Sequence, residues 1–176
     1  MRRGLLLLVA LALGGCALDR YETLRPQTSA TDRAMRAIVA KPAGPGPFPV
    51  VLILHGAAGP RPNGERWAAE LRELGFMTVV PDQYGPLGIT DTLTRQGALW
   101  ERYRDTHSMV RHLQTRPDVR PDRIVVMGFS QGGVLAAGVM TSQWDLLDAL
   151  DAPPMPRPAA GIGFYGLCTF FPPRLH

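Results

Sequence analysis

The sequence predicts an α/β fold in which helices cover both faces of a mostly parallel sheet. Three continuous apolar runs, at residues 50–55, 76–84 and 123–129, are typical of strands that are buried on both faces. Helical patterns separate these runs, and such an alternation predicts parallel strands joined by crossover helices. Of the 176 residues, 45% are hydrophobic and 19% are charged, which excludes a disordered chain and suits one domain with a core.

The first sixteen residues differ from the rest of the chain. Two arginines precede an apolar run at residues 5–13, which is too short to span a bilayer and has the length of a signal-peptide core. The run ends in Leu-Gly-Gly-Cys16, so residues 1–16 resemble a bacterial lipoprotein signal peptide, in which this cysteine is lipidated. The alternative is an ordinary secretory leader that contains a cysteine.

This resemblance implies an exported protein with a lipid anchor at Cys16. Acyl chains on the cysteine would hold the domain at the membrane of a bacterial cell envelope, facing the periplasm. Ala17, and not an aspartate, follows the cysteine. By resemblance to Gram-negative sorting signals, this favours the outer membrane.

The net charge of +4 is modest. The basic residues are almost all arginine, Lys41 being the only lysine, and they are scattered along the chain. We interpret them as ordinary surface arginines, and we expect no nucleic-acid partner.

The domain is expected at residues 35–176. Residues 17–34 are polar and lack a clear period, which indicates a tether and an entry segment. Residues 35–42 alternate well enough for a first strand, and the Pro/Gly cluster at 43–49 ends it. The β-branched run at 50–55 is then the first strand buried on both faces.

The first expected helix spans residues 65–75. Trp67, Leu71 and Leu74 recur there at helical spacing, and Gly75 is a good C-terminal signal. The chain then enters the second buried strand, at residues 76–84.

The second half of the domain repeats this alternation. Residues 94–115 predict a helix that Pro117 ends. Its expected buried positions are Leu99, Tyr103, Val110 and Leu113. A strand at 123–129 leads into a helix of small residues at 131–143, which can pack closely on a sheet. A proline-rich linker then leads to the last strand, at residues 159–166.

The segment Gly128-Phe129-Ser130-Gln131-Gly132 has the pattern G-x-S-x-G at a strand-to-helix turn. Gly128 and Gly132 leave room for a tight, strained backbone, so that Ser130 points outward at the carboxyl end of the sheet. The backbone N–H of Gln131 would bind the negative charge that grows on a carbonyl oxygen during attack. The strand–turn–helix context favours a nucleophilic serine over a structural turn.

A second donor to this oxyanion is expected in the loop after the first buried strand, within residues 52–59. The best candidate is the backbone N–H of Ala57, with Ala58 as the alternative. We interpret His55 as a strand-end histidine that orders this loop, in preference to a general base. It is also a candidate for the wall of the substrate pocket.

Asp82 and Tyr84 are further candidates for the substrate pocket. Both follow the second buried strand at its carboxyl end, where pockets form in open α/β sheets. The alternative, which we prefer, is an aspartate that orders a loop and a partly buried tyrosine.

Four segments resemble the dienelactone hydrolase-like branch of the α/β-hydrolases: FPVVLILHGAAG, WAAELRELGFMTVVPDQYGPLG, RPDVRPDRIVVMGFSQGG and AAGIGFYGLC. They cover most of residues 36–168 in the order and spacing of that family. The resemblance implies hydrolysis of esters, lactones or related carbonyl substrates through an acyl-enzyme, without a metal or an organic cofactor. The founding enzymes use a cysteine nucleophile, whereas Ser130 stands here, so cleavage of dienelactone itself is not expected.

In this family the catalytic aspartate and histidine follow the nucleophile in that order, after the strand that corresponds to residues 159–166. The chain ends at His176, before either is expected. The following residues are not expected to replace them: Asp145, Asp148, Asp151, His107, His112 and His176. We therefore expect an α/β-hydrolase fold that is truncated after the strand following the nucleophile helix. We interpret it as the N-terminal part of a longer hydrolase; the alternative is a natural truncation.

Cys168 fits this expectation, because in similar proteins a second cysteine follows in the absent region and a disulfide forms in the periplasm. The alternative function is a catalytically dead fold that serves as a binding or assembly module in the envelope. The sequence does not indicate an oligomeric state.

Overall fold

The computed structural model describes residues 20–26, 32–89, 98–150 and 155–166. The predicted signal peptide lies outside these residues, together with Cys16, Asp151, Cys168 and His176. No helix in the described ranges has both the length and the apolar character needed to cross a membrane.

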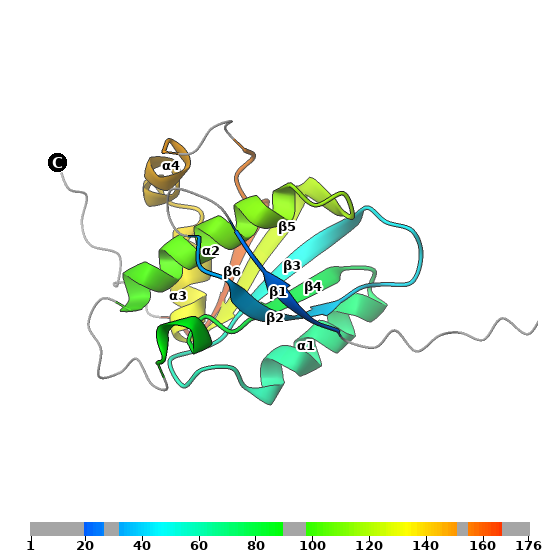
Figure 1. The fold of residues 1–176 in the computed structure, drawn as a ribbon, viewed down its shortest axis with the longest axis horizontal. Coiled ribbons are helices and arrows are strands. Elements are labelled where there is room, and N and C mark those ends of the chain that lie inside the picture. The colour runs from blue at the N-terminus through cyan, green and yellow to red at the C-terminus, as the bar shows by residue number, and fades with distance from the viewer. Residues whose placement is uncertain (1–19, 27–31, 90–97, 151–154, 167–176) are drawn as a thin grey trace, which may run out of the picture.

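Six strands form one sheet in the order β1-β2-β4-β3-β5-β6 (Figure 1). Their bounds are β1 Arg20–Leu24, β2 Met35–Ala40, β3 Phe48–Leu54, β4 Met77–Pro81, β5 Val119–Phe129 and β6 Ala160–Phe164. β3 pairs in parallel with β4 and β5, and β5 pairs in parallel with β6. β1 and β2 are antiparallel to their neighbours. The sheet is therefore mostly parallel, as predicted.

Helices connect the parallel strands. Their bounds are α1 Pro62–Glu73, the short 3-10 helix η1 Gly85–Leu87, α2 Ala98–Gln114, α3 Gln131–Gly138 and α4 Ser142–Asp148. α1 crosses from β3 to β4, and α2 crosses from β4 to β5 (Figure 1). The predicted α/β alternation is confirmed over this part of the chain.

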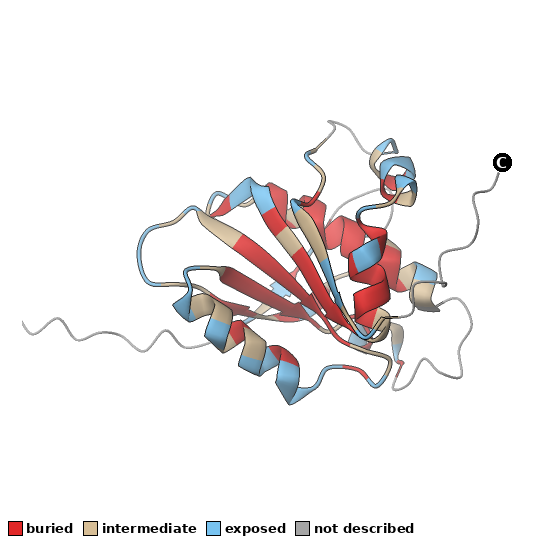
Figure 2. Ribbon diagram, turned by 180° about the vertical axis from the view of Figure 1, so that it is seen from behind, coloured by how far each residue is buried: buried red, intermediate tan, exposed pale blue. Residues whose placement is uncertain are grey.

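Side chains alternate across β3 and divide the core into two. Leu52 and Leu54 pack in the larger cluster, with residues of α2, α3 and α4 such as Leu113 and Trp144. Val51 and Ile53 point to the other face, where α1 and its flanks contribute Ala68, Trp67 and Leu71. Figure 2 shows the buried residues gathered in the central strands and on the helix faces that cover them.

The structure differs from the sequence-based expectation at β1, at the start of β5 and at the end of α3, among other places. Residues 20–24 lie within the expected tether, yet they form β1, because Arg20 to Leu24 pair with Val39 to Met35 of β2. β5 begins at Val119, four residues before the expected strand. α3 ends at Gly138, because the carbonyl of Gly138 accepts the N–H and the hydroxyl of Thr141 in a turn at 2.9 and 2.7 Å.

α3 lies directly on the backbone of β6. A Cβ on Gly161 would stand 2.0 Å from the carbonyl oxygen of Ala136, and one on Gly163 would stand 2.8 Å from that of Gly133. Real Cβ atoms do not approach so closely, so this contact requires glycine on the strand. It holds the start of α3 close to the sheet.

Candidate active site

Ser130 occupies the turn between β5 and α3 with φ 52° and ψ −116°. Positive φ is uncommon and costly for a residue with a side chain. Two backbone bonds hold the turn: Ser130 N–H donates to Phe164 O at 2.9 Å, and Ser130 O accepts from Val134 N–H at 3.1 Å. The strained backbone that the sequence predicts for a nucleophilic serine is therefore present.

The two glycines of the G-x-S-x-G segment are required by backbone contacts. A Cβ on Gly128 would stand 2.1 Å from the carbonyl oxygen of Gly132. A Cβ on Gly132 would stand 2.4 Å from the carbonyl oxygen of Leu54 and 2.7 Å from that of His55. These contacts bring the start of α3 against the carboxyl end of β3.

The loop after β3 begins with a turn over residues 56–59. Gly59 N–H donates to Gly56 O at 3.2 Å, which leaves Ala57 and Ala58 as the two central residues. The turn's own hydrogen bond does not use the N–H of Ala57. A Cβ on Gly56 would stand 3.4 Å from Ser130 Cβ, so the turn lies beside the serine. The structure thus brings together Ser130, Ala57 and Gln131, the first residue of α3.

His55 is 6% exposed and lies under this turn. Its Nδ1 is 2.8 Å from Gly56 O, and its Nε2 accepts the N–H of Gln83 at 3.4 Å, an arrangement that fits a neutral ring protonated on Nδ1. Burial, with the nearby Arg102 charge, lowers the pKa of His55 to about 4. These contacts agree with the interpretation that His55 orders the loop.

A polar cluster lies beneath Ser130 and was not found by sequence reasoning. It joins Arg102 and Gln83, which are 0% and 1% exposed, to His55, Tyr84 and Gln131. Arg102 Nη1 donates to Gln131 Oε1 at 3.0 Å, and Arg102 Nη2 donates to His55 O at 2.5 Å. Buried arginines are rare unless paired. An arginine in a helical pattern gives no sequence signal of such burial.

Asp82 and Tyr84 follow β4 at its carboxyl end, as expected. Asp82 Oδ1 accepts the N–H groups of Tyr84 and Gly85 at 3.0 and 2.9 Å, so it orders the turn into η1. Tyr84 is only 2% exposed, and its ring packs edge-on against the His55 ring at 4.5 Å. Their role in substrate binding, like that of His55, stays a prediction.

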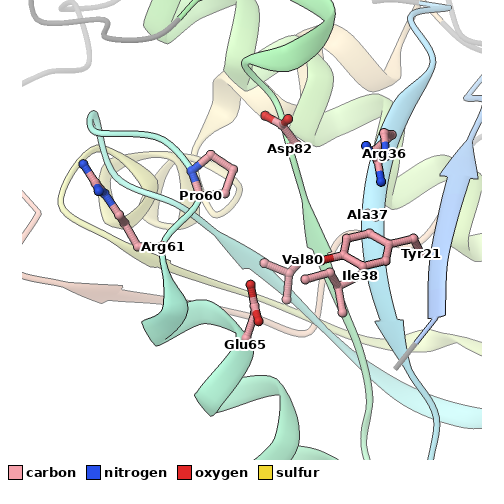
Figure 3. A pocket seen from close by; sticks show the side chains of 9 residues that line it. All are labelled: Tyr21, Arg36, Ala37, Ile38, Pro60, Arg61, Glu65, Val80 and Asp82. Atoms are coloured by element: carbon pink, nitrogen blue, oxygen red, sulfur yellow. The ribbon is translucent and has the colours of Figure 1, made fainter. Parts of the chain in front are cut away.

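A cleft of about 230 Å³ lies between β2, β4 and the start of α1 (Figure 3). Its lining residues are Tyr21, Arg36, Ala37, Ile38, Pro60, Arg61, Glu65, Val80 and Asp82. They come from β1, β2, β4 and α1, from the loop before α1, and from the first residue after β4. Among the predicted site residues that the structure describes, only Asp82 lines it, while Ser130, Ala57 and Gln131 do not.

The sequence model of the dienelactone hydrolase family matches residues 35–168, about three quarters of the chain. The chain belongs to the dienelactone hydrolase family. The matched residues include the turn at Ser130, the loop at Ala57 and the polar cluster around Arg102.

One protein is similar to this chain in sequence, and two solved structures are similar to it in fold. A Bradyrhizobium protein named a probable 2-oxo-3-(5-oxofuran-2-ylidene)propanoate lactonase is 26% identical over 142 residues, which are 76% of this chain and 52% of that protein. A dienelactone hydrolase-like promiscuous phosphotriesterase from metagenomic libraries has a TM-score of 0.54 and 20% identity, over 69% of this chain and 55% of its own. Thermogutta terrifontis esterase 2, solved after phosphorylation by paraoxon, has a TM-score of 0.53 and 17% identity, over 69% and 46%.

The structural matches show a shared α/β-hydrolase fold. The chain spans about half the length of the curated relative that it matches.

In this member of the dienelactone hydrolase family, the described residues bring no histidine into a hydrogen bond with the Ser130 hydroxyl. His107 is 0% exposed and packs against the Trp144 ring at 4.6 Å. His112 is half-buried, and burial lowers its pKa. Asp145 and Asp148, expected on a solvated helix face, pair with Arg157 and Arg111. The described ranges also contain no group of three or more His, Cys, Asp or Glu residues that could hold a metal ion.

Proposed function

We propose that Ser130 is the nucleophile of a hydrolase that cleaves esters, lactones or related carbonyl compounds through an acyl-enzyme. One observation carries this proposal: Ser130 has φ 52° at a strand-to-helix turn, beside a second turn that presents Ala57. A strained backbone at this position is a recognised feature of nucleophilic serines in α/β-hydrolases. A purely structural turn at this point would be more stable with glycine.

The proposed reaction begins when Ser130 Oγ attacks the substrate carbonyl and loses its proton to a general base. The carbonyl oxygen becomes an oxyanion, which the backbone N–H groups of Gln131 and Ala57 stabilise. The C–O bond to the leaving alcohol then breaks, and the alcohol takes up a proton. Water hydrolyses the acyl-Ser130 ester in the same way, releasing the acid and restoring the hydroxyl.

We propose that the base and its carboxylate partner lie outside the described residues. His55 is a poor candidate, because burial lowers its pKa to about 4 and both ring nitrogens already have partners. Family membership supports a histidine and an aspartate that follow Ser130 in sequence. The described residues alone are then expected to hydrolyse esters far more slowly than the whole enzyme.

The names of the relatives support the substrate class. One matched protein is named a lactonase, and a structural neighbour is an esterase that paraoxon phosphorylates. Esters, lactones and phosphotriesters all present an electrophilic centre with an oxygen that becomes negatively charged during attack. A pair of backbone N–H donors serves each of them.

The decisive experiment is labelling with a fluorophosphonate, followed by mapping of the adduct by mass spectrometry. We expect the adduct on Ser130 and no labelling of Ser130→Ala. The exposed Ser142 supplies a matched control, and Ser142→Ala should label like the wild type. If the wild-type protein is folded but is not labelled at Ser130, the hydrolase proposal is wrong and the binding-module alternative gains support.

We further propose that the protein is exported and carries a lipid on Cys16. This rests on the sequence of residues 1–16, whose apolar core ends in Leu-Gly-Gly-Cys. In a bacterial host grown with an alkyne fatty acid, the wild type and Cys168→Ser should both incorporate label and fractionate with membranes. Cys16→Ser should do neither. Incorporation that survives in Cys16→Ser would disprove the anchor.

A further inference from the structure

The guanidinium of Arg102 is a buried charge between Gln131 and the backbone of His55. Arg102 is 0% exposed, and burial lowers its pKa to about 10, so it stays protonated at neutral pH. Removing a cation from water is costly unless hydrogen bonds replace the lost hydration. The partners of this cation therefore show what it stabilises.

Its first partner is the residue that follows the proposed nucleophile. Arg102 Nη1 donates to Gln131 Oε1 at 3.0 Å, and Tyr84 Oη donates to the same oxygen at 3.4 Å. These two donors, Arg102 on α2 and Tyr84 before η1, thereby hold the Gln131 side chain in place. Since the backbone N–H of Gln131 is a proposed oxyanion donor, this bond restrains the donor next to Ser130.

Its second partner is the segment that bears the other donor. Arg102 Nη2 donates to the backbone carbonyl of His55 at 2.5 Å. His55 lies two residues before Ala57, and its ring bonds to the carbonyl of Gly56. The carbonyl of His55 is thus held in place at the start of the Ala57 turn.

Gln83 locks the guanidinium between these two partners. Its Oε1 accepts from Arg102 Nε at 3.2 Å and Nη2 at 3.0 Å, while its Nε2 donates to Arg102 O at 3.0 Å and Thr106 Oγ1 at 3.2 Å. The Arg102 side chain consequently has little rotational freedom. Its planar set of five N–H donors can reach several acceptors at once, which a lysine ammonium cannot do in the same geometry.

We infer that Arg102 is a positioning residue that sets the distance between the Ala57 and Gln131 N–H donors by binding both segments at once. This inference rests on the proposed function, because it assigns Arg102 to the oxyanion site of Ser130. It predicts that loss of Arg102 slows attack by Ser130 more than it weakens ligand binding. A merely structural arginine would lower stability and leave the reactivity of the folded protein unchanged.

The test is the second-order rate of Ser130 labelling by a fluorophosphonate, measured well below the unfolding temperature. We expect Arg102→Met to label about 10²-fold more slowly, the size of the loss when one oxyanion donor is removed. Arg102→Lys keeps the charge but not the two-sided geometry, so it should also be slow. Arg104→Met alters a partly exposed arginine two residues away on α2 and should label at the wild-type rate.

Steady-state kinetics of the whole enzyme on an activated ester provide the second readout. We expect a lower kcat for Arg102→Met with a nearly unchanged KM, because the donors act mainly in the transition state. Added guanidinium ion should partly restore the labelling rate of Arg102→Ala. A folded Arg102→Met protein with wild-type labelling and kcat would overturn the inference.

Amide hydrogen exchange tests the positioning role of Arg102 independently of whether Ser130 is a nucleophile. It also serves for variants whose stability is low. In Arg102→Met, the amides of residues 56–58 and 131–132 should exchange faster, while those of the β3 interior stay protected. Gln131→Leu removes only one of the two attachments, so exchange should rise at residues 131–132 alone. If wild-type Ser130 is not labelled, the hydrolase proposal fails, and exchange alone then decides the positioning role. Unchanged exchange at both segments would refute it.

Discussion

Gly132 lies so close to Leu54 that a Cβ on the glycine would stand 2.4 Å from the leucine carbonyl oxygen. This contact joins the start of α3 to the carboxyl end of β3, and it places the Ser130 turn beside the Ala57 turn. A Cβ on Gly132 would meet the backbone carbonyls of Leu54 and His55. Because these are backbone atoms, no neighbouring side chain can make room for it by changing its rotamer.

Gly132→Ala should therefore lower the free energy of unfolding by about 3 kcal/mol, the upper range for overpacked positions. Urea denaturation measures this loss. Ala137→Ser, at an exposed position of the same helix, is the control and should change stability by less than about 0.5 kcal/mol. A Gly132→Ala protein as stable as the wild type would contradict the contact.

Ser130→Gly should make the folded domain more stable by about 1 kcal/mol while abolishing fluorophosphonate labelling. Glycine relieves the strain of φ 52°, and this gain exceeds the entropy that glycine adds to the unfolded chain. Thermal unfolding measures the change. Ser142→Gly, in the first turn of α4, should have the opposite sign, because glycine is a poor helix former. A fall in stability for Ser130→Gly would show that the turn is unstrained.

His55 should make the domain less stable in mild acid. Burial lowers its pKa to about 4, whereas an unfolded histidine titrates near 6.5. Between these values the unfolded chain binds more protons, so stability rises with pH; the contribution is complete above about pH 6.5 and is lost as pH falls through 4. Across this pH window, we expect the free energy of unfolding to rise by about 2 kcal/mol less in His55→Asn than in the wild type.

Denaturation at a series of pH values between 4 and 7 tests this expectation. His112→Asn is the comparison, because that histidine is only half-buried. Equal slopes for His55→Asn and the wild type would remove His55 as the source of the pH dependence.

Asp105 should act in the opposite direction. Its carboxyl group is 1% exposed, and burial raises its pKa to about 6 although Arg33 lies 3.0 Å away. The folded chain then binds more protons than the unfolded chain between about pH 4 and 6, so this group lowers stability as pH rises through that window. Asp105→Asn should make the stability of the domain rise more steeply with pH there. Asp32→Asn, an exposed neighbour of Arg33, should not change the slope.

Asp118 should contribute to stability through a small ion-pair network. Arg116 donates to its two carboxylate oxygens at 2.9 and 3.0 Å, Lys41 Nζ lies 2.7 Å away, and Arg116 also binds Glu22 at 2.8 Å. The bonds from Arg116 hold the pKa of Asp118 well below its usual range. Its contribution is present above about pH 4 and is lost as pH falls further.

Asp118→Asn should cost about 1 kcal/mol at neutral pH, and 1 M NaCl should reduce that cost. Paired denaturation curves at low and high salt measure both effects. Asp122, which is 62% exposed and 3.6 Å from Arg123, is the control, and Asp122→Asn should have little effect. If the loss of stability in Asp118→Asn were the same at low and high salt, Asp118 would stabilise the domain by packing and not by its charge.

The parallel strands and the Ser130 turn were predictable because their signals are local. β3 and β4 are continuous apolar runs, and G-x-S-x-G sits between a strand and a helix of small residues. β1 was missed, because five residues of mixed polarity become a strand only through pairing with β2. Nothing in the sequence near residues 20–24 marks that partner.

Arg102 was missed for a related reason. Its partners Gln83, Gln131 and His55 lie 19, 29 and 47 residues away in the sequence. On an amphipathic helix an arginine is normally assigned to the solvent face. Only the fold shows that its acceptors meet at one point, so the polar half of the candidate site could not be derived from local patterns.

The contact between α3 and β6 has a consequence for how sequence changes are tolerated in this domain. The atoms nearest to a Cβ on Gly161 or Gly163 are backbone atoms of the helix, so no substitution at these positions can be compensated by a smaller neighbour. In a saturation mutagenesis screen for folded protein, they should be intolerant to every side chain, whereas Ser130 should accept alanine and glycine. Selection for fold and selection for catalysis would thus fall on different residues of the same β5-α3-β6 unit.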